Sequence, residues 1–163
     1  MQMAEADIAG NIARIRERIA QAAARSGRPA EAIALVAVTK TVEPARIAQA
    51  YAAGLRDFGE NYMQEALTKI GQPLLDRLDM RWHFIGHLQS NKARDAVGRF
   101  ALIQSVDSLS LAKEIGKRAQ RAGQEAAILL EIKLDTGADT KFGLAPEDAI
   151  ETAAEVSEIA GVR

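Results

Sequence analysis

Short runs of apolar residues alternate with amphipathic segments along the chain. Residues 34–38 are apolar without interruption and end in a polar stretch. A continuous apolar run of this kind is typical of a parallel strand that is buried on both faces. Together with the turn residues between them, such runs predict strands at 33–39, 56–59, 81–86, 100–105 and 126–132.

Segments with helical periodicity lie between these strands. Isoleucines recur at spacings of three and four through residues 8–24, which predicts an amphipathic helix before the first strand. Glycine or proline marks the ends of most other segments of this type. Further helices are predicted at 43–54, 61–70, 90–97, 107–122 and 146–160.

The alternation of strand and helix indicates a parallel sheet with right-handed crossovers. A helix before the first strand and the shortness of the strands favour a (β/α)8 TIM barrel over a doubly wound sheet. A complete barrel needs eight strands and about 250 residues. The 163-residue chain instead ends at Val162 and Arg163, where a sixth strand would begin. We therefore expect residues 1–163 to form a single partial (β/α)-barrel domain that is truncated at its C-terminus.

The first strand carries the main chemical candidate. Its apolar run leads directly into Thr39, Lys40 and Thr41. Ligands of parallel α/β folds bind at the carboxyl ends of the strands, so Lys40 would present a partly desolvated amine there. Such an amine is a nucleophile for Schiff-base formation with a carbonyl, above all that of pyridoxal 5'-phosphate (PLP). The stretch alone also fits a surface lysine whose stem lies along apolar residues.

Composition narrows the function classes. The chain is 48% hydrophobic and 26% charged with a net charge of −1, an ordinary globular balance without the basic excess of a nucleic-acid-binding protein. It has no cysteine and two histidines, too few for an ordinary zinc site. No apolar run approaches the 18 residues of a membrane span. The acidic start lacks the apolar core of a signal peptide, so we expect a cytoplasmic protein.

Three motifs carry a resemblance to a known family. They are Val-Ala-Val-Thr-Lys-Thr at 36–41, Phe-Gly-Glu-Asn-Tyr-Met-Gln-Glu at 58–65, and Trp-His-Phe-Ile-Gly-His-Leu-Gln-Ser-Asn-Lys at 82–92. Read together, they resemble the pyridoxal phosphate homeostasis proteins (the YggS/PROSC family). Residues 105–107 and a Lys-x-Gly ending of the long loop at 141–143 agree with this resemblance, which covers the chain in order.

The resemblance implies a (β/α)8 barrel like the N-terminal domain of alanine racemase. It implies that PLP is held as a Schiff base on Lys40, and that the protein carries and buffers PLP in intracellular PLP and amino-acid homeostasis. The implied partners are PLP and PLP-dependent apo-enzymes. No ordinary PLP enzyme activity is expected, and neither nucleic acid nor membrane is expected as a partner. The full-length form would be a monomer.

Four further residues are candidates for the site, and three of them have two interpretations each. Asn61 follows the second strand, where its amide either reaches the cofactor or caps the next helix. His83 is either a buried histidine with a satisfied partner or a proton-transfer group. His87 falls in the loop at the ligand face. Lys141 is either a second amine for PLP, as in relatives, or a solvated lysine, in a loop about one residue longer than usual.

The end of the chain is the largest departure from the family. The family's Ser-x-Gly-Met-Ser and Arg-Ile-Gly stretches, which would hold the phosphate and face the pyridine nitrogen, have no counterpart in these residues. We therefore expect the 163-residue chain to hold PLP poorly. We also expect it to self-associate, because its first and fifth strands would be unpaired edges.

Two other functions remain open from the sequence. An alanine-racemase-like amino-acid racemase needs a second acid/base group on the opposite face of the cofactor, usually a tyrosine from another domain. Tyr51 and Tyr62 are the two tyrosines of this chain. The other alternative is a scaffold or interaction protein that has lost cofactor binding.

Overall fold

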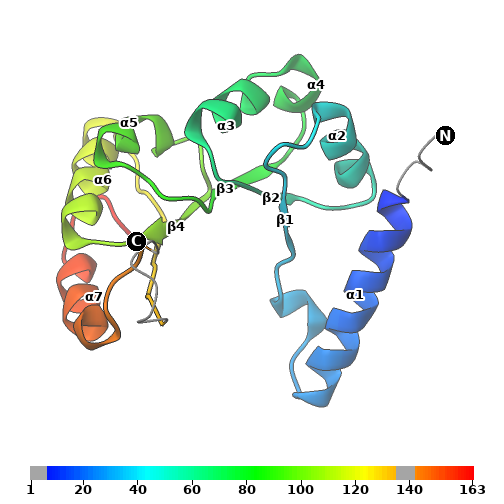
Figure 1. The fold of residues 1–163 in the computed structure, drawn as a ribbon, viewed down its shortest axis with the longest axis horizontal. Helices are drawn as coiled ribbons and strands as arrows, with labels where there is room; N and C mark the ends of the chain where they lie inside the picture. Colours follow the sequence, from blue (N-terminus) through cyan, green and yellow to red (C-terminus); the bar gives the residue numbers. More distant parts are fainter. Residues whose placement is uncertain (1–6, 135–141) are drawn as a thin grey trace.

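A parallel sheet bends into an arc, with most of the helices along its convex side (Figure 1). The structure is a computed structural model that describes residues 7–134 and 142–163. Its sheet has the order β1-β2-β3-β4-β5, and every pair is parallel. The strands are β1 (Val36–Val38), β2 (Asp57–Glu60), β3 (Arg81–Phe84), β4 (Leu102–Val106) and β5 (Ile128–Leu130). Each strand pairs with the next, as in a barrel, so the predicted partial (β/α)8 fold is confirmed.

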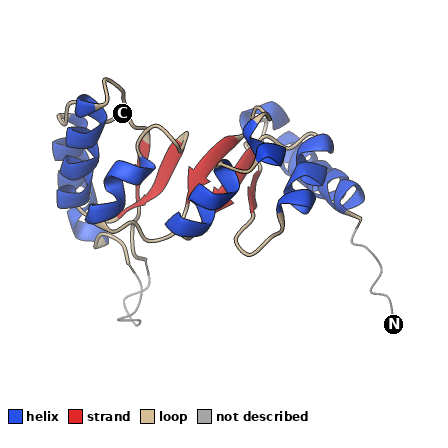
Figure 2. Ribbon diagram, turned by 90° about the horizontal axis from the view of Figure 1, so that it is seen from above, coloured by secondary structure: helices blue, strands red, loops and turns tan. Residues whose placement is uncertain are grey.

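Helices connect the strands and flank the sheet at both ends of the molecule (Figure 2). They are α1 (Ile8–Arg25), α2 (Pro44–Ala52), α3 (Met63–Ile70), α4 (Pro73–Asp76), α5 (Ala93–Ala96), α6 (Leu109–Arg121) and α7 (Ala149–Ser157). Short 3-10 turns cover Ala30–Ala32, Ser90–Lys92 and Pro146–Asp148. The sequence did not predict α4, because Pro73 was interpreted only as a stop, whereas proline also suits the first helical position.

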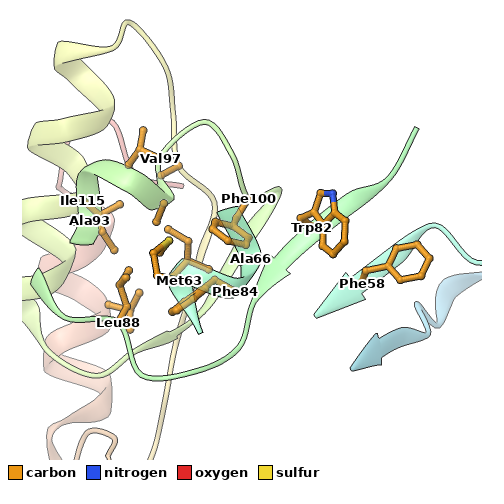
Figure 3. Close-up of a cluster of buried hydrophobic side chains, with 14 of the residues drawn as sticks. Phe58, Met63, Ala66, Trp82, Phe84, Leu88, Ala93, Val97, Phe100 and Ile115 are labelled. Atoms are coloured by element: carbon orange, nitrogen blue, oxygen red, sulfur yellow. The ribbon is translucent and has the colours of Figure 1, made fainter. Parts of the chain in front are cut away.

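The core lies between the sheet and the helices. Phe58 and Trp82 pack with ring centroids 5.7 Å apart, and Phe84 packs edge-on against Phe100 at 5.2 Å (Figure 3). Successive side chains of a strand point to opposite faces. Since Trp82 lies in this core, alternation along β3 puts the next residue, His83, on the concave face.

The two outer strands differ from the expectation of two bare edges. At the β5 side, Val162 forms a parallel bridge with Ala126. The Arg163 N–H donates to the Ala126 carbonyl at 3.0 Å, and the Ile128 N–H donates to the Arg163 carbonyl at 3.0 Å. Past the carboxyl end of β5, Leu144 forms a parallel bridge with Ile132. The expectation of an unpaired fifth strand is therefore wrong at both of its ends. The free side of β1 borders an apolar groove of about 440 Å³ between α1 and α2.

Candidate cofactor site

The register of the sheet brings the two predicted cofactor residues to neighbouring positions. Val38 of β1 pairs with Gly59 of β2, and Gly59 pairs with His83 of β3. Two residues further along, Lys40 and Asn61 follow β1 and β2 at the carboxyl edge of the sheet. This is the edge at which parallel α/β folds bind ligands.

Lys40 lies on the concave side of the arc. Alternation along β1 puts Val36 and Val38 on this side, and Lys40 continues the alternation. Lys40 is exposed, and Val38 keeps 54% of its surface exposed. The sequence predicts a partly desolvated lysine, and this prediction is wrong, because the Lys40 side chain is exposed. Desolvation needs other elements packed over the concave face, and the described residues cover the convex face instead.

Asn61 carries a buried oxygen without a partner. Its Oδ1 accepts no hydrogen bond from the described residues. Helix α3 begins two residues later, and its N-cap residue is Tyr62, which makes no side-chain capping bond. Asn61 therefore does not cap α3, and its amide oxygen can accept a hydrogen bond from a ligand. Gly86 packs against the backbone of Asn61, and only glycine leaves room there, because a Cβ at position 86 would lie 2.1 Å from the Asn61 carbonyl oxygen.

His83 belongs to a polar cluster on the concave face. Its Nε2 lies 2.9 Å from Asp57 Oδ1, and its Nδ1 lies 3.0 Å from Gln104 Nε2. Arg81 binds the same Asp57 carboxylate through two nitrogens, at 2.7 and 2.5 Å. Both ring nitrogens of His83 are thus engaged within the protein. This arrangement favours the structural interpretation of His83 over a proton-transfer role.

The charge of this cluster is centred on Asp57. The Arg81 guanidinium holds the pKa of Asp57 below its ordinary value, His83 lowers it further, and burial acts in the opposite direction. Asp57 in turn raises the pKa of Arg81. Asp57 is therefore an ionised anchor between β2 and β3, below the edge that carries Lys40 and Asn61.

His87 joins three loops at the same edge. Its Nδ1 lies 3.1 Å from Asp107 Oδ2, which follows β4. Its ring stacks on Phe142 with the centroids 3.6 Å apart and an angle of 13° between the planes. The predicted position of His87 at the ligand face is consistent with this contact. Lys141, the neighbour of Phe142, lies outside the described residues.

A buried ion-pair cluster contacts the backbone next to Lys40. The sequence patterns did not predict it. Lys69 Nζ of α3 lies 2.8 Å from Glu60 Oε1 and 2.6 Å from Glu65 Oε1, and it donates to the Thr39 carbonyl at 2.5 Å. The side chains of Lys69 and Glu60 are 7% and 0% exposed. The spacing of four residues between Glu65 and Lys69 was the available signal, but it is shared by many surface pairs.

Two other kinds of site receive no support from the described residues. Over residues 7–134 and 142–163, no group of three or more histidine or acidic side chains could hold a metal ion. No helix in that part of the chain is long and apolar enough to cross a membrane. The Tyr51 ring packs under the Arg56 guanidinium at 4.0 Å, and Tyr62, which follows Asn61 in the chain, is 57% exposed.

Comparison with known proteins decides the family. Residues 10–163 match the family model of the alanine racemase N-terminal domain. The pyridoxal phosphate homeostasis protein of Pseudomonas aeruginosa is 41% identical over 96% of this chain and 66% of the relative. Its Escherichia coli K12 counterpart is 38% identical over 96% of this chain and 67% of the relative. The chain belongs to the alanine racemase N-terminal domain family and, within it, to the pyridoxal phosphate homeostasis proteins. The resemblance seen in the three motifs is confirmed, and the chain spans about two thirds of the length of these relatives.

Solved structures agree with this family. PipY of Synechococcus elongatus PCC7942, solved with PLP bound, matches with a TM-score of 0.79 and 38% identity over 96% of this chain and 67% of that chain. A protein of Bifidobacterium adolescentis matches with a TM-score of 0.86 and 34% identity over 96% of this chain and 66% of that chain. An alanine racemase of Clostridium difficile, at 16% identity over 80% of this chain and 34% of that chain, matches with a TM-score of 0.65 and shows the shared fold alone.

Proposed function

We propose that this chain binds PLP through a Schiff base on Lys40 and takes part in carrying and buffering PLP. Lys40 would supply the amine that condenses with the aldehyde of PLP, with a C=N bond replacing the C=O bond and one water molecule released. Hydrolysis reverses the step and releases PLP. The observation that carries the proposal is the position of Lys40 just past the carboxyl end of β1. Lys40 lies two residues beyond Val38, and the pairing partner of Val38, Gly59, lies two residues before Asn61.

Residues of this chain fit the group that the relatives' name implies. The Asn61 Oδ1 is a buried acceptor that has no donor among residues 7–134 and 142–163. Lys40 is exposed on the open side of the sheet, so an aldehyde reaches it without any rearrangement of the core. PipY, a 38% identical protein of the same fold, has been solved with PLP bound. These observations support Lys40 as the covalent position and Asn61 as a residue that orients the ligand.

A role in homeostasis rather than in catalysis completes the proposal. Racemisation through PLP needs an acid/base group on each face of the ring. The Tyr51 ring of α2 packs under the Arg56 guanidinium. This leaves Tyr62, which follows Asn61 in the chain, as the tyrosine at the edge that carries Lys40. We infer a cytoplasmic carrier whose partners are PLP-dependent apo-enzymes, with residues 1–163 as one barrel-type domain. We expect no racemase or transaminase turnover in the ordinary range of about 1–1,000 per second. The optical rotation of L-alanine incubated with the protein checks racemase activity, and its loss at such a rate would contradict this expectation.

A PLP titration followed by absorbance tests the proposal. The wild-type chain, Lys40→Ala and Lys113→Ala are compared at the same protein concentration, and Lys113 is an exposed lysine of α6 that gives the same change in charge. We expect a Schiff-base absorbance band with the wild type and with Lys113→Ala, and none with Lys40→Ala. An unchanged band with Lys40→Ala would overturn the assignment of Lys40. Absence of a band with all three proteins at saturating PLP would overturn the proposed binding.

A further inference from the structure

The two peptide groups that flank the Cα of Lys40 are both held by side chains of one ion pair. Before Lys40, the Thr39 carbonyl accepts a hydrogen bond from Lys69 Nζ at 2.5 Å. After Lys40, the Thr41 N–H donates to Glu65 Oε1 at 2.5 Å. Lys69 and Glu65 themselves are joined at 2.6 Å. Because the two flanking peptides determine the backbone direction at Lys40, this pair sets the direction of its Cα–Cβ bond.

The backbone beyond Lys40 adopts a conformation that needs such support. Thr41 has a φ of 59°, and it is the one non-glycine residue with positive φ in the described part of the chain. A β-branched residue in the left-handed region is disfavoured and persists only where its surroundings hold it. The hydrogen bond from the Thr41 N–H to Glu65 contributes to this hold, beside the backbone bond at 3.0 Å from the Val42 N–H to the Thr39 carbonyl that closes the turn around Lys40.

Glu60 fixes the ion pair from the sheet side. Its carboxylate is completely buried, and its Oε1 lies 2.8 Å from Lys69 Nζ. The same oxygen accepts the Thr39 hydroxyl at 2.6 Å. Glu60 Oε2 is buried without a partner among the described residues. The ammonium of Lys69 is therefore held between two carboxylates, one on β2 and one on its own helix. Moving it away from the Thr39 carbonyl would break a buried ion pair, which costs free energy.

We propose that Glu60, Glu65 and Lys69 are positioning residues that fix the backbone of Lys40 and so aim its amine at the cofactor. This inference rests on the proposed function and adds the part of the protein that prepares Lys40 for it. An exposed lysine has four rotatable side-chain bonds, so a fixed starting direction reduces the entropy lost when its amine is captured by a ligand. A purely structural ion pair would stabilise the fold without changing the reactivity of Lys40.

The test separates these two roles with Glu65→Ala, Glu65→Gln and a control. Glu114→Ala removes a carboxylate from an equivalent pair on α6, where Arg118 Nε lies 2.5 Å from Glu114 Oε1 at the same spacing of four residues. The first measurement is the rate at which PLP with borohydride labels Lys40, corrected for the folded fraction. The second is the hydrogen-exchange rate of the Thr41 amide without PLP.

We expect Glu65→Ala to slow labelling of Lys40 about tenfold, the effect of losing one charge-assisted hydrogen bond, and to speed exchange of the Thr41 amide. Glu65→Gln should show rates between those of the wild type and of Glu65→Ala, because its amide oxygen still accepts from the Thr41 N–H. Glu114→Ala should show the wild-type rates. Faster exchange with unchanged labelling would overturn the positioning role and leave the proposed function intact. No labelling of the wild type would overturn both.

A second variant keeps the test decisive if Glu65→Ala does not fold. Thr41→Gly leaves every side chain of the ion-pair cluster in place, and glycine adopts positive φ without strain. It also keeps the N–H at position 41 that donates to Glu65, so Glu65→Ala can be compared in this background. The positioning role predicts that adding Glu65→Ala to Thr41→Gly slows labelling of Lys40 relative to Thr41→Gly alone, and equal labelling rates in these two proteins would contradict it.

Discussion

Lys69→Met should destabilise the protein far more than the loss of a surface charge. Lys69 is 7% exposed, and its ammonium is the cation next to the fully buried carboxylate of Glu60. Methionine keeps most of the volume of the side chain, so the cost comes from the charge and not from a cavity. Removing one partner of a buried pair typically costs about 3–5 kcal/mol. At a urea dependence of about 2 kcal/mol per molar, the unfolding midpoint would fall by about 1.5–2.5 M.

Two further variants show that the unpaired carboxylate is the cause. Adding Glu60→Gln to Lys69→Met replaces the buried charge by a neutral amide, so the double variant should recover part of the lost stability. Arg118→Met breaks the partly exposed pair with Glu114 and should cost less than about 1 kcal/mol. All four proteins are compared by urea unfolding at neutral pH. A loss for Lys69→Met no larger than that for Arg118→Met would refute the reasoning.

Three other predictions follow from particular contacts. Arg81 lowers the pKa of Asp57 in the folded state, so the stability from this pair is present above the ordinary pKa of 3.8 and is lost as pH falls through the lower pKa of the folded state. Asp57→Asn should therefore flatten the acid side of a pH–stability profile. Gly86→Ala puts a Cβ 2.1 Å from the Asn61 carbonyl oxygen and should cost at least about 1–3 kcal/mol in thermal or urea unfolding. The 163-residue chain should self-associate through the open side of β1, and light scattering should show less association after Val38→Lys, which charges this edge; a monomeric wild type would contradict this expectation.

The helices and strands were largely predictable because their signals are local. Isoleucine spacing predicted α1 (Ile8–Arg25), and Ser108, a residue type that favours helix starts, caps α6 by accepting from the Leu111 N–H at 3.3 Å. The motif at 58–65 placed Asn61 directly after the second strand, with a cofactor contact and a helix cap as its two interpretations. Helix α4 (Pro73–Asp76) was missed, since the same proline suits a helix start and a helix end.

The environment of the site was less predictable because it depends on contacts between distant residues. The exposure of Lys40 depends on which elements cover the concave face, and no pattern within β1 reports that. The cluster behind it joins Thr39, Glu60 and Lys69, which are 9 to 30 residues apart in the chain. The two interpretations of Asn61 likewise differed only in the geometry of the turn before α3, where Tyr62 and not Asn61 is the N-cap residue.

Peptide mapping after borohydride reduction of the PLP-treated chain tests the central claim most directly. Reduction makes the Schiff base permanent, and mass spectrometry then identifies the lysine that carries the pyridoxyl group. The account predicts that Lys40 is the modified residue in the wild type and that Lys40→Ala removes the label from the protein. A label chiefly on Lys133 or Lys141, with Lys40 unmodified, would contradict it.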